Sequence, residues 1–264
     1  MRARPFDWRK TPGIAPFAAF AIIFLYAPLV VLVIYAFNAN NVVTIWTSFS
    51  LKWFGVAIQD QAIRDATFNS IVVAVASTIL ATIIATLGAL GLERGPNFRG
   101  RGTAIGLVGL PLVVPEIVTA VTTLVFFSGI GLNLGLFNLI IAHTVFCIPF
   151  AMLPIQARLK EMPAGVEEAA RDLYADERRL FMKVTLPLLA PGIMSGAMLA
   201  FVTSLDDFII SLMLAGAGTT TLPVYIYSML RVGVTPEINA ISTLLLLLSL
   251  IFVVAALLLT RKRS

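Results

Sequence analysis

The sequence predicts an all-α integral membrane protein that crosses the bilayer six times. Of its 264 residues, 59% are hydrophobic and only 12% are charged. An ordinary soluble domain has about 25% charged residues, so a water-soluble globular enzyme is excluded. In addition, six stretches lack Asp, Glu, Lys and Arg, and each exceeds the roughly 20 residues that an apolar helix needs to cross a bilayer. These stretches are residues 11–51, 66–92, 117–157, 184–205, 208–230 and 238–260.

We expect one transmembrane domain over residues 1–264, in which each span is an apolar helix. The first run, 13–37, is too long for the apolar core of a secretory signal peptide, and no clear small-residue cleavage site follows it, so we interpret it as a retained span. The six expected spans are 13–37, 67–92, 103–128, 135–157, 188–215 and 238–260.

The positions of the basic residues predict the orientation. Sixteen of the 19 Lys and Arg residues lie at the two termini or in the second and fourth loops, and only Lys52, Arg64 and Arg231 lie in the other loops. Basic residues concentrate in cytoplasmic loops, so both termini are predicted to be cytoplasmic. The net charge of +5 thus reflects topology, and no nucleic-acid partner is expected.

Proline and glycine interrupt several of the expected spans. A proline removes a backbone donor and bends a helix, which in lipid persists only where neighbours or water satisfy the freed groups. Such bends suit a transport pathway, although static bundles contain them too. Gly192 and Gly196 form a small-residue pair that allows close helix contact. The interrupting residues are Pro111, Pro115, Pro149, Pro154, Pro191 and Gly192.

Single histidine and cysteine residues limit the chemistry that the chain can perform. A zinc site or a histidine-based triad is hard to build around His143 alone, and Cys147 cannot form an internal disulfide. We interpret both as packed inside the helix bundle, and we expect neither a metal site nor catalytic residues.

The fourth loop is the most polar part of the chain, with twelve charges between residues 158 and 183. Acidic residues near its start and basic residues near its end favour a helix through its dipole. The sequence predicts a surface helical segment with a small apolar face, which is either a solvated loop or a docking element for a soluble partner. Its apolar face would comprise Val166, Ala170, Leu173 and Tyr174.

A motif in this loop resembles a known family. The Glu168–Ala170 triplet, followed at the family's spacing by Val184, Leu186 and Pro187, is similar to the EAA loop of bacterial ABC-importer permeases. The resemblance implies a six-helix type I permease fold, and a coupling helix within a loop at 158–187 that sits in a cleft of an ATPase subunit. The residues implied in coupling are Glu168, Ala169, Ala170, Asp172, Tyr174, Leu186 and Pro187.

One position departs from the family pattern, because the family glycine falls on Tyr174. Glycine tolerates a bend with positive φ, whereas tyrosine resists it. Either the bend here uses ordinary φ values, or the docking geometry differs.

A second resemblance indicates the substrate. Residues 204–211, 222–240 and 115–118 are similar to spermidine/putrescine permeases, most of all to the second permease of the pair. The resemblance implies a polyamine importer in the bacterial inner membrane, with a homologous second permease, two cytoplasmic ATPase copies and an extracytoplasmic binding protein. The chain lacks a Gly-x4-Gly-Lys-Ser/Thr motif, so ATP and Mg would bind to the partner ATPase and this chain would hold no cofactor.

Three acids lie within the expected spans: Glu116, Asp206 and Asp207. A charge at the bilayer centre costs at least ~3 kcal/mol, so such residues face water or the bundle interior. On a continuous helix Asp207 would share a polar stripe with Thr203 and Ser211. We expect Asp207 and Glu116 to line the path and attract ammonium groups, and Asp206 to hold a neighbouring helix or the partner permease.

Other interpretations stay open at this point. The acids could instead cap broken helices beside the prolines, or form buried pairs. Tyr225, in the outer segment 216–237, would contribute to the external gate or to binding-protein contact. The substrate could be another cationic or zwitterionic solute. A self-contained secondary carrier or cation channel would explain the acids but not the EAA loop, and a membrane assembly subunit would not transport at all.

Overall fold

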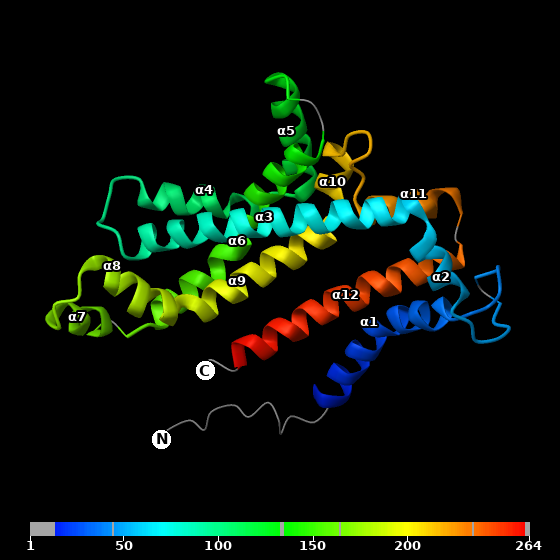
Figure 1. The fold of residues 1–264 in the computed structure, drawn as a ribbon, viewed down its shortest axis with the longest axis horizontal. Coiled ribbons are helices and arrows are strands. Elements are labelled where there is room, and N and C mark those ends of the chain that lie inside the picture. The colour runs from blue at the N-terminus through cyan, green and yellow to red at the C-terminus, as the bar shows by residue number, and fades with distance from the viewer. Residues whose placement is uncertain (1–13, 44, 133–134, 164, 234, 262–264) are drawn as a thin grey trace. The chain divides into compact units, whose positions relative to one another are not determined.

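The computed structural model is helical throughout almost all of the described residues, which are 14–43, 45–132, 135–163, 165–233 and 235–261 (Figure 1). An isolated antiparallel β-bridge joins Asn38 and Phe49. The helices are α1 Ile14–Ala36, α2 Lys52–Gln59, α3 Gln61–Glu93, α4 Arg101–Val113, α5 Glu116–Gly129, α6 Leu136–Glu161, α7 Gly165–Asp172, α8 Glu177–Leu180, a π-helical turn Phe181–Thr185, α9 Leu186–Asp206, α10 Ile209–Leu214, α11 Leu222–Val232 and α12 Pro236–Arg261.

The expected spans are confirmed in type, and two of them are interrupted. Within the described part of the chain, five helical segments are long and apolar enough to cross a membrane, and α4 with α5 makes a sixth if that pair is one crossing. In the expected span 103–128, the interruption predicted at Pro115 is confirmed, since α4 and α5 meet there at an angle of 109°, whereas Pro111 lies inside α4. The expected helix 188–215 is also interrupted, between Asp206 and Ile209.

Proline explains the first break. Val114 and Pro115 both have extended backbone angles, with ψ of 133° and 132°. A residue before proline avoids the helical region, and proline itself has no N–H to donate. The carbonyl of Pro115 then accepts from the amides of Val118 and Thr119, at 2.9 and 3.3 Å, so the new helix begins at once.

The chain divides into two compact units, residues 1–59 with 229–246, and residues 60–228 with 247–264. In the first unit, Phe37 lies against Phe49 and Phe54, with ring centroids 5.4 and 5.0 Å apart. The side-chain amide of Asn38 donates to the carbonyl of Ile45 at 2.8 Å. These contacts fold the segment after α1 back on itself.

The second unit is built on α3, α6 and α9, which pack against one another. Small side chains line the contact, so that the helices approach closely. A Cβ on Gly196 would collide with the backbone carbonyl of Ala151, and one on Gly192 would lie 2.6 Å from Cβ of Arg158. The prediction that this glycine pair permits close helix contact is therefore confirmed.

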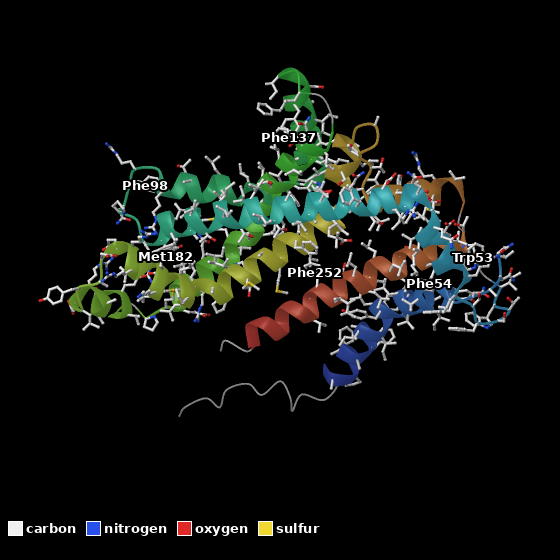
Figure 2. All side chains as sticks on the ribbon, viewed as in Figure 1. Trp53, Phe54, Phe98, Phe137, Met182 and Phe252 are labelled. Atoms are coloured by element: carbon white, nitrogen blue, oxygen red, sulfur yellow. The ribbon has the colours of Figure 1, made fainter. Side chains whose placement is uncertain are left out.

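Apolar side chains cover the outer faces of these helices, as Figure 2 shows along α3 and α4. Phe98, Phe137 and Met182 are at least half exposed. Phe252, in contrast, stacks on Phe201 with ring centroids 4.0 Å apart. An apolar exterior of this kind suits a hydrocarbon environment rather than water.

We expect Gly196→Ala to destabilise the protein by about 1–3 kcal/mol, because the carbonyl that a methyl group would strike belongs to a helix backbone that cannot move aside. Gly91→Ala on α3 is the matched control, since a Cβ there meets no atom within 4 Å. Thermal unfolding in detergent measures both variants. Equal Tm values for the two would contradict the proposed close contact.

Candidate functional site

The coupling loop (residues 158–187) contains a short helix that ends in a strained turn. α7 stops at Asp172, and Tyr174 has φ of +58°. The amide of Tyr174 donates to the carbonyl of Arg171 at 2.9 Å, and that of Ala175 donates to Ala170 at 3.1 Å. This pair of bonds is a Schellman motif, whose left-handed position glycine usually fills.

A tyrosine therefore occupies the left-handed position of this turn, where the family pattern has glycine. The alternative that the bend uses ordinary φ values is wrong. A side chain at this φ costs roughly 1–2 kcal/mol, because its Cβ approaches the following carbonyl. The expected apolar face is corrected as well: Leu173 and Tyr174 lie beyond the helix end, and they are 82% and 95% exposed.

The other residues implied in coupling lie on both sides of this turn. Glu168, Ala169 and Asp172 are exposed on α7, and Ala170 is half-buried. Leu186 and Pro187 begin α9. Since Pro187 has no N–H, the preceding turn relaxes to π-helical bonding, with the amide of Leu186 donating to the carbonyl of Phe181.

An acid that the sequence interpretation passed over attaches α7 to the membrane helices. Glu167 Oε2 lies 3.9 Å from Nη1 of Arg94, at the end of α3. Its Oε1 accepts from the hydroxyl of Thr185, in the π-helical turn, at 3.1 Å. The neighbouring Glu168 carries the family motif, but nothing in the sequence distinguishes which of the two adjacent acids turns inward.

A second ion pair closes the turn between α7 and α8. Arg171 Nε donates to Oε1 of Glu177 at 2.9 Å, and both groups are exposed. This hydrogen bond and the charge of Arg171 lower the pKa of the Glu177 carboxyl. The pair therefore contributes to the turn at neutral pH and is lost as the pH falls through that lowered pKa, although water screens it.

The break between α9 and α10 is held by Asp207. Its backbone is extended, with φ of −62° and ψ of 126°. Its Oδ1 accepts from the amides of Ile210 and Ser211, at 3.0 and 3.2 Å, and so caps the start of α10. The side chain is buried, with the residue 6% exposed. The expected stripe of Asp207 with Thr203 and Ser211 is thus wrong, because no continuous helix joins them.

The three acids of the spans nevertheless come together, and we call Glu116, Asp206 and Asp207 the acid cluster. Each of them interacts electrostatically with the other two. Glu116 is the first residue of α5, and α5 packs against α10. The break between α4 and α5 and the break between α9 and α10 therefore both contribute acids to the cluster. Asp206 is exposed and Glu116 is partly exposed, whereas Asp207 is buried. The three acids form no arrangement that would hold a metal ion among the described side chains.

The remaining candidates lie on α9, α10 and α11. Thr203 on α9 is partly exposed, and Ser211 on α10 is fully buried. Tyr225 is partly exposed on α11, the helix whose Tyr227 ring lies 4.8 Å from that of Phe208 in the break.

The loop between α10 and α11 is fixed to α3, which the sequence did not predict. The side-chain amide of Asn69 donates to the carbonyls of Gly218 and Thr220, at 3.0 and 3.1 Å. The hydroxyl of Ser70 accepts from the amide of Leu222 at 2.7 Å. Two adjacent polar residues in an apolar helix were the available signal, but their partners lie about 150 residues away.

Comparison with known proteins places the chain in a family. Residues 81–264 match the family described as "Binding-protein-dependent transport system inner membrane component". The chain belongs to this family. Its resemblance to ABC-importer permeases and its location in the bacterial inner membrane, both predicted from the sequence, are confirmed.

Two curated relatives are named as a putrescine permease and a spermidine/putrescine permease. The chain is 38% identical over 229 residues to the putrescine transport system permease protein PotI of Escherichia coli K12, covering 84% of this chain and 82% of the relative. It is 36% identical over 241 residues to the spermidine/putrescine transport system permease protein PotC of the same strain, covering 91% of both.

Solved structures confirm the fold of ABC-importer permeases. A chain of the bacterial alginate ABC transporter, in complex with its alginate-bound periplasmic protein, matches with a TM-score of 0.71 and 19% identity over 97% of this chain and 95% of its own. A chain of the inward-facing MetNI methionine ABC transporter matches with a TM-score of 0.64 and 22% identity, over 75% of this chain and 94% of its own.

We expect Glu167→Gln to loosen α7, because Arg94 and Thr185 lose a charged partner worth about 1 kcal/mol. Hydrogen exchange of residues 165–172 should then speed up by roughly three- to tenfold. Glu161→Gln is the matched control, since among the described residues Glu161 forms an ion pair with Arg158 of its own helix and its side chain is largely exposed. Identical exchange in both variants would show that Glu167 does not hold α7.

Proposed function

We propose that this chain is the non-catalytic permease of an ATP-driven importer for polyamines such as putrescine and spermidine. The identity to two permeases named for these solutes supports the substrate class. The observation that carries the proposal within the structure is the acid cluster, which sits where two spans are broken. A polyamine carries several ammonium groups, and an acidic site at helix breaks in the membrane is suited to attract them.

Within this proposal, the three acids have different roles. Glu116 and Asp206 line the path, because they are the two with exposed surface. Asp207 shapes the site, because two backbone amides already occupy one of its oxygens. Weak attraction at more than one group suits a pathway, since tight binding would trap the solute. High-affinity selection is assigned to the extracytoplasmic binding protein.

The proposed partners follow from the same assignment. A homologous second permease completes the pathway, and two copies of a cytoplasmic ATPase bind ATP and Mg. In a cycle of alternating access, α7 moves with the ATPase to which it is bound. This movement is transmitted to the acid cluster through Glu177–Asp206, a continuous helical segment of 30 residues. At 1.5 Å per residue this segment is about 45 Å long, enough to cross the membrane.

Reconstituted vesicles test the proposed function against its alternatives. Polyamine uptake should require both the ATPase and the binding protein, and should survive collapse of the proton gradient. Uptake by the purified chain alone would support a secondary carrier or channel instead. A screen of ligands on the cognate binding protein would show whether another cationic or zwitterionic solute is the substrate.

Neutral variants of the acids test the path. We expect Asp206→Asn and Glu116→Gln each to lower polyamine uptake by about tenfold at low solute concentration, because each removes one attractive charge worth about 1 kcal/mol or more. Asp65→Asn is the control, since Asp65 is exposed on α3 and is not among the acids that interact with Asp207. Unchanged uptake by the double variant, in complexes that still hydrolyse ATP, would remove both acids from the path.

Variants of Tyr174 test the docking surface. Tyr174→Gly removes the strain of a positive φ, so the isolated chain should gain up to about 1 kcal/mol. It also removes an aromatic ring that is free to enter a groove on the ATPase. We therefore expect the ATPase to co-purify several-fold less with Tyr174→Gly, and equally less with Tyr174→Asn, whose side chain tolerates the same φ. Full ATPase retention by both variants would show that the ring makes no contact.

A further inference from the structure

A chain of buried polar side chains surrounds His143, the only histidine in the sequence. The residue is 1% exposed, on α6. Its Nδ1 lies 2.8 Å from Oγ of Ser204, near the end of α9. Its Nε2 lies 3.1 Å from Oγ of Ser211, on α10. One imidazole ring therefore bonds to both halves of the broken fifth span.

We assign the direction of each hydrogen bond starting from Ser77, the last side chain of the network. Ser77 on α3 donates its single hydroxyl proton to the carbonyl of Val73 at 2.7 Å, and lies 2.9 Å from the hydroxyl of Ser204. We place the Ser77 proton on this carbonyl, which makes Ser204 the donor between the two serines. Ser204 has then used its own proton, so it accepts from Nδ1–H of His143.

This assignment sets the tautomer of the neutral ring. With its one proton on Nδ1, the imidazole presents Nε2 as an acceptor, and the hydroxyl of Ser211 donates to it. The donors run in one direction from Ser211 through His143, Ser204 and Ser77 to Val73, and thus from α10 through α6 and α9 to α3. A buried network in which every member has its partner is rigid.

The network ends beside the acid cluster. The amide of Ser211 donates to Oδ1 of Asp207, while its hydroxyl donates to His143. The other oxygen of Asp207, Oδ2, has no hydrogen-bond partner among the described residues, and it lies 4.0 Å from Nε2 of His143. The placement of Asp207, and with it the neighbouring exposed Asp206, thus depends on the ring.

We propose that His143 is a positioning residue for transport, which clasps α9 to α10 across the break at Asp207 and Phe208. The clasp holds the start of α10 in place and so fixes where Asp206 is presented to the solute. This inference rests on the proposed function in that it assigns Asp206 to the path, but the clasp itself is a property of the fold that can be measured without a solute.

Two conservative variants separate the halves of the clasp. The side-chain amide of His143→Asn lies near the position of Nδ1 and can donate to Ser204, but it does not reach Ser211. The amide of His143→Gln lies near the position of Nε2 and can accept from Ser211, but it does not serve Ser204. His143→Ala removes both bonds. Thr144→Val is the control, because the hydroxyl of the buried Thr144 donates only to Ile140 of its own helix.

Hydrogen exchange of the assembled complex reports on α10. We expect residues 209–214 to exchange about tenfold faster in His143→Ala and His143→Asn, and to exchange as in the wild type in His143→Gln and Thr144→Val, because one lost buried bond changes a local opening equilibrium by about that factor. Wild-type exchange in both His143→Ala and His143→Asn would overturn the clasp.

Labelling of Cys147 reports on α9. This is the only cysteine in the chain; it is fully buried, and its Sγ lies 3.5 Å from the carbonyl of Ala200 on α9. We expect a membrane-permeant maleimide to label it several-fold faster in His143→Ala and His143→Gln than in His143→Asn, which keeps the bond to Ser204. Equal labelling in His143→Asn and His143→Gln would also overturn the clasp.

Uptake completes the test. Per assembled complex, polyamine uptake should fall about tenfold in each of the three His143 variants and stay within about twofold of the wild type in Thr144→Val, because both bonds are needed to place the break. Uptake by His143→Ala within twofold of the wild type would overturn the positioning role. If His143→Ala does not assemble, then exchange, labelling and uptake are measured in His143→Asn and His143→Gln, whose expected results are given above. A wild-type complex that takes up no polyamine would refute the proposed function instead, and would leave the exchange and labelling results to test the clasp.

Discussion

The structure depends on a single constraint, which is that a helix broken inside a membrane must still satisfy its backbone donors and acceptors. The fifth span is interrupted at Asp207, and the amides at the start of α10 would otherwise face an apolar interior. One oxygen of Asp207 accepts two of these amides. At the other break, the carbonyl of Pro115 accepts from the amides of Val118 and Thr119 in the first turn of α5. A helix start in lipid therefore calls for acceptors, and a carboxylate is the strongest acceptor that a side chain offers.

This requirement also accounts for the gathering of charge. Because α5 packs against α10, the starts of these two helices lie close together, and their acids form one cluster. The extended backbone at Asp207 separates it from the residue before it, so that Asp206 is exposed while Asp207 is buried. The two consecutive aspartates thus have different surroundings: Asp207 caps the start of α10, and Asp206 is exposed at the break.

The sequence was sufficient for the spans, because their signal is local. Runs of apolar residues predict α1, α3, α6 and α12 to within six residues at each end, and the charge-rich segment 158–183 predicts the surface helix α7. The breaks could be anticipated only in part. Pro115 marks the first, whereas no proline or glycine marks Asp207, and a charged residue in an apolar run looks the same whether the helix continues or stops. The interpretation that the acids cap broken helices is supported for Asp207.

Long-range polar contacts could not be predicted, because their meaning lies in partners that the chain brings from elsewhere. His143 reads as one polar residue in an apolar helix, and packing inside the bundle was a correct but incomplete interpretation. Its role depends on Ser204 and Ser211, which are some 60 residues distant and lie on opposite sides of a break that was itself unexpected. The conformation of Tyr174 could not be predicted from its residue type either. Propensity alone argues against positive φ for tyrosine, yet the two hydrogen bonds of the Schellman motif impose it, and the ring is turned outward where a partner can reach it. A strained residue persists where the surrounding structure imposes its conformation, and at Tyr174 those two hydrogen bonds do so.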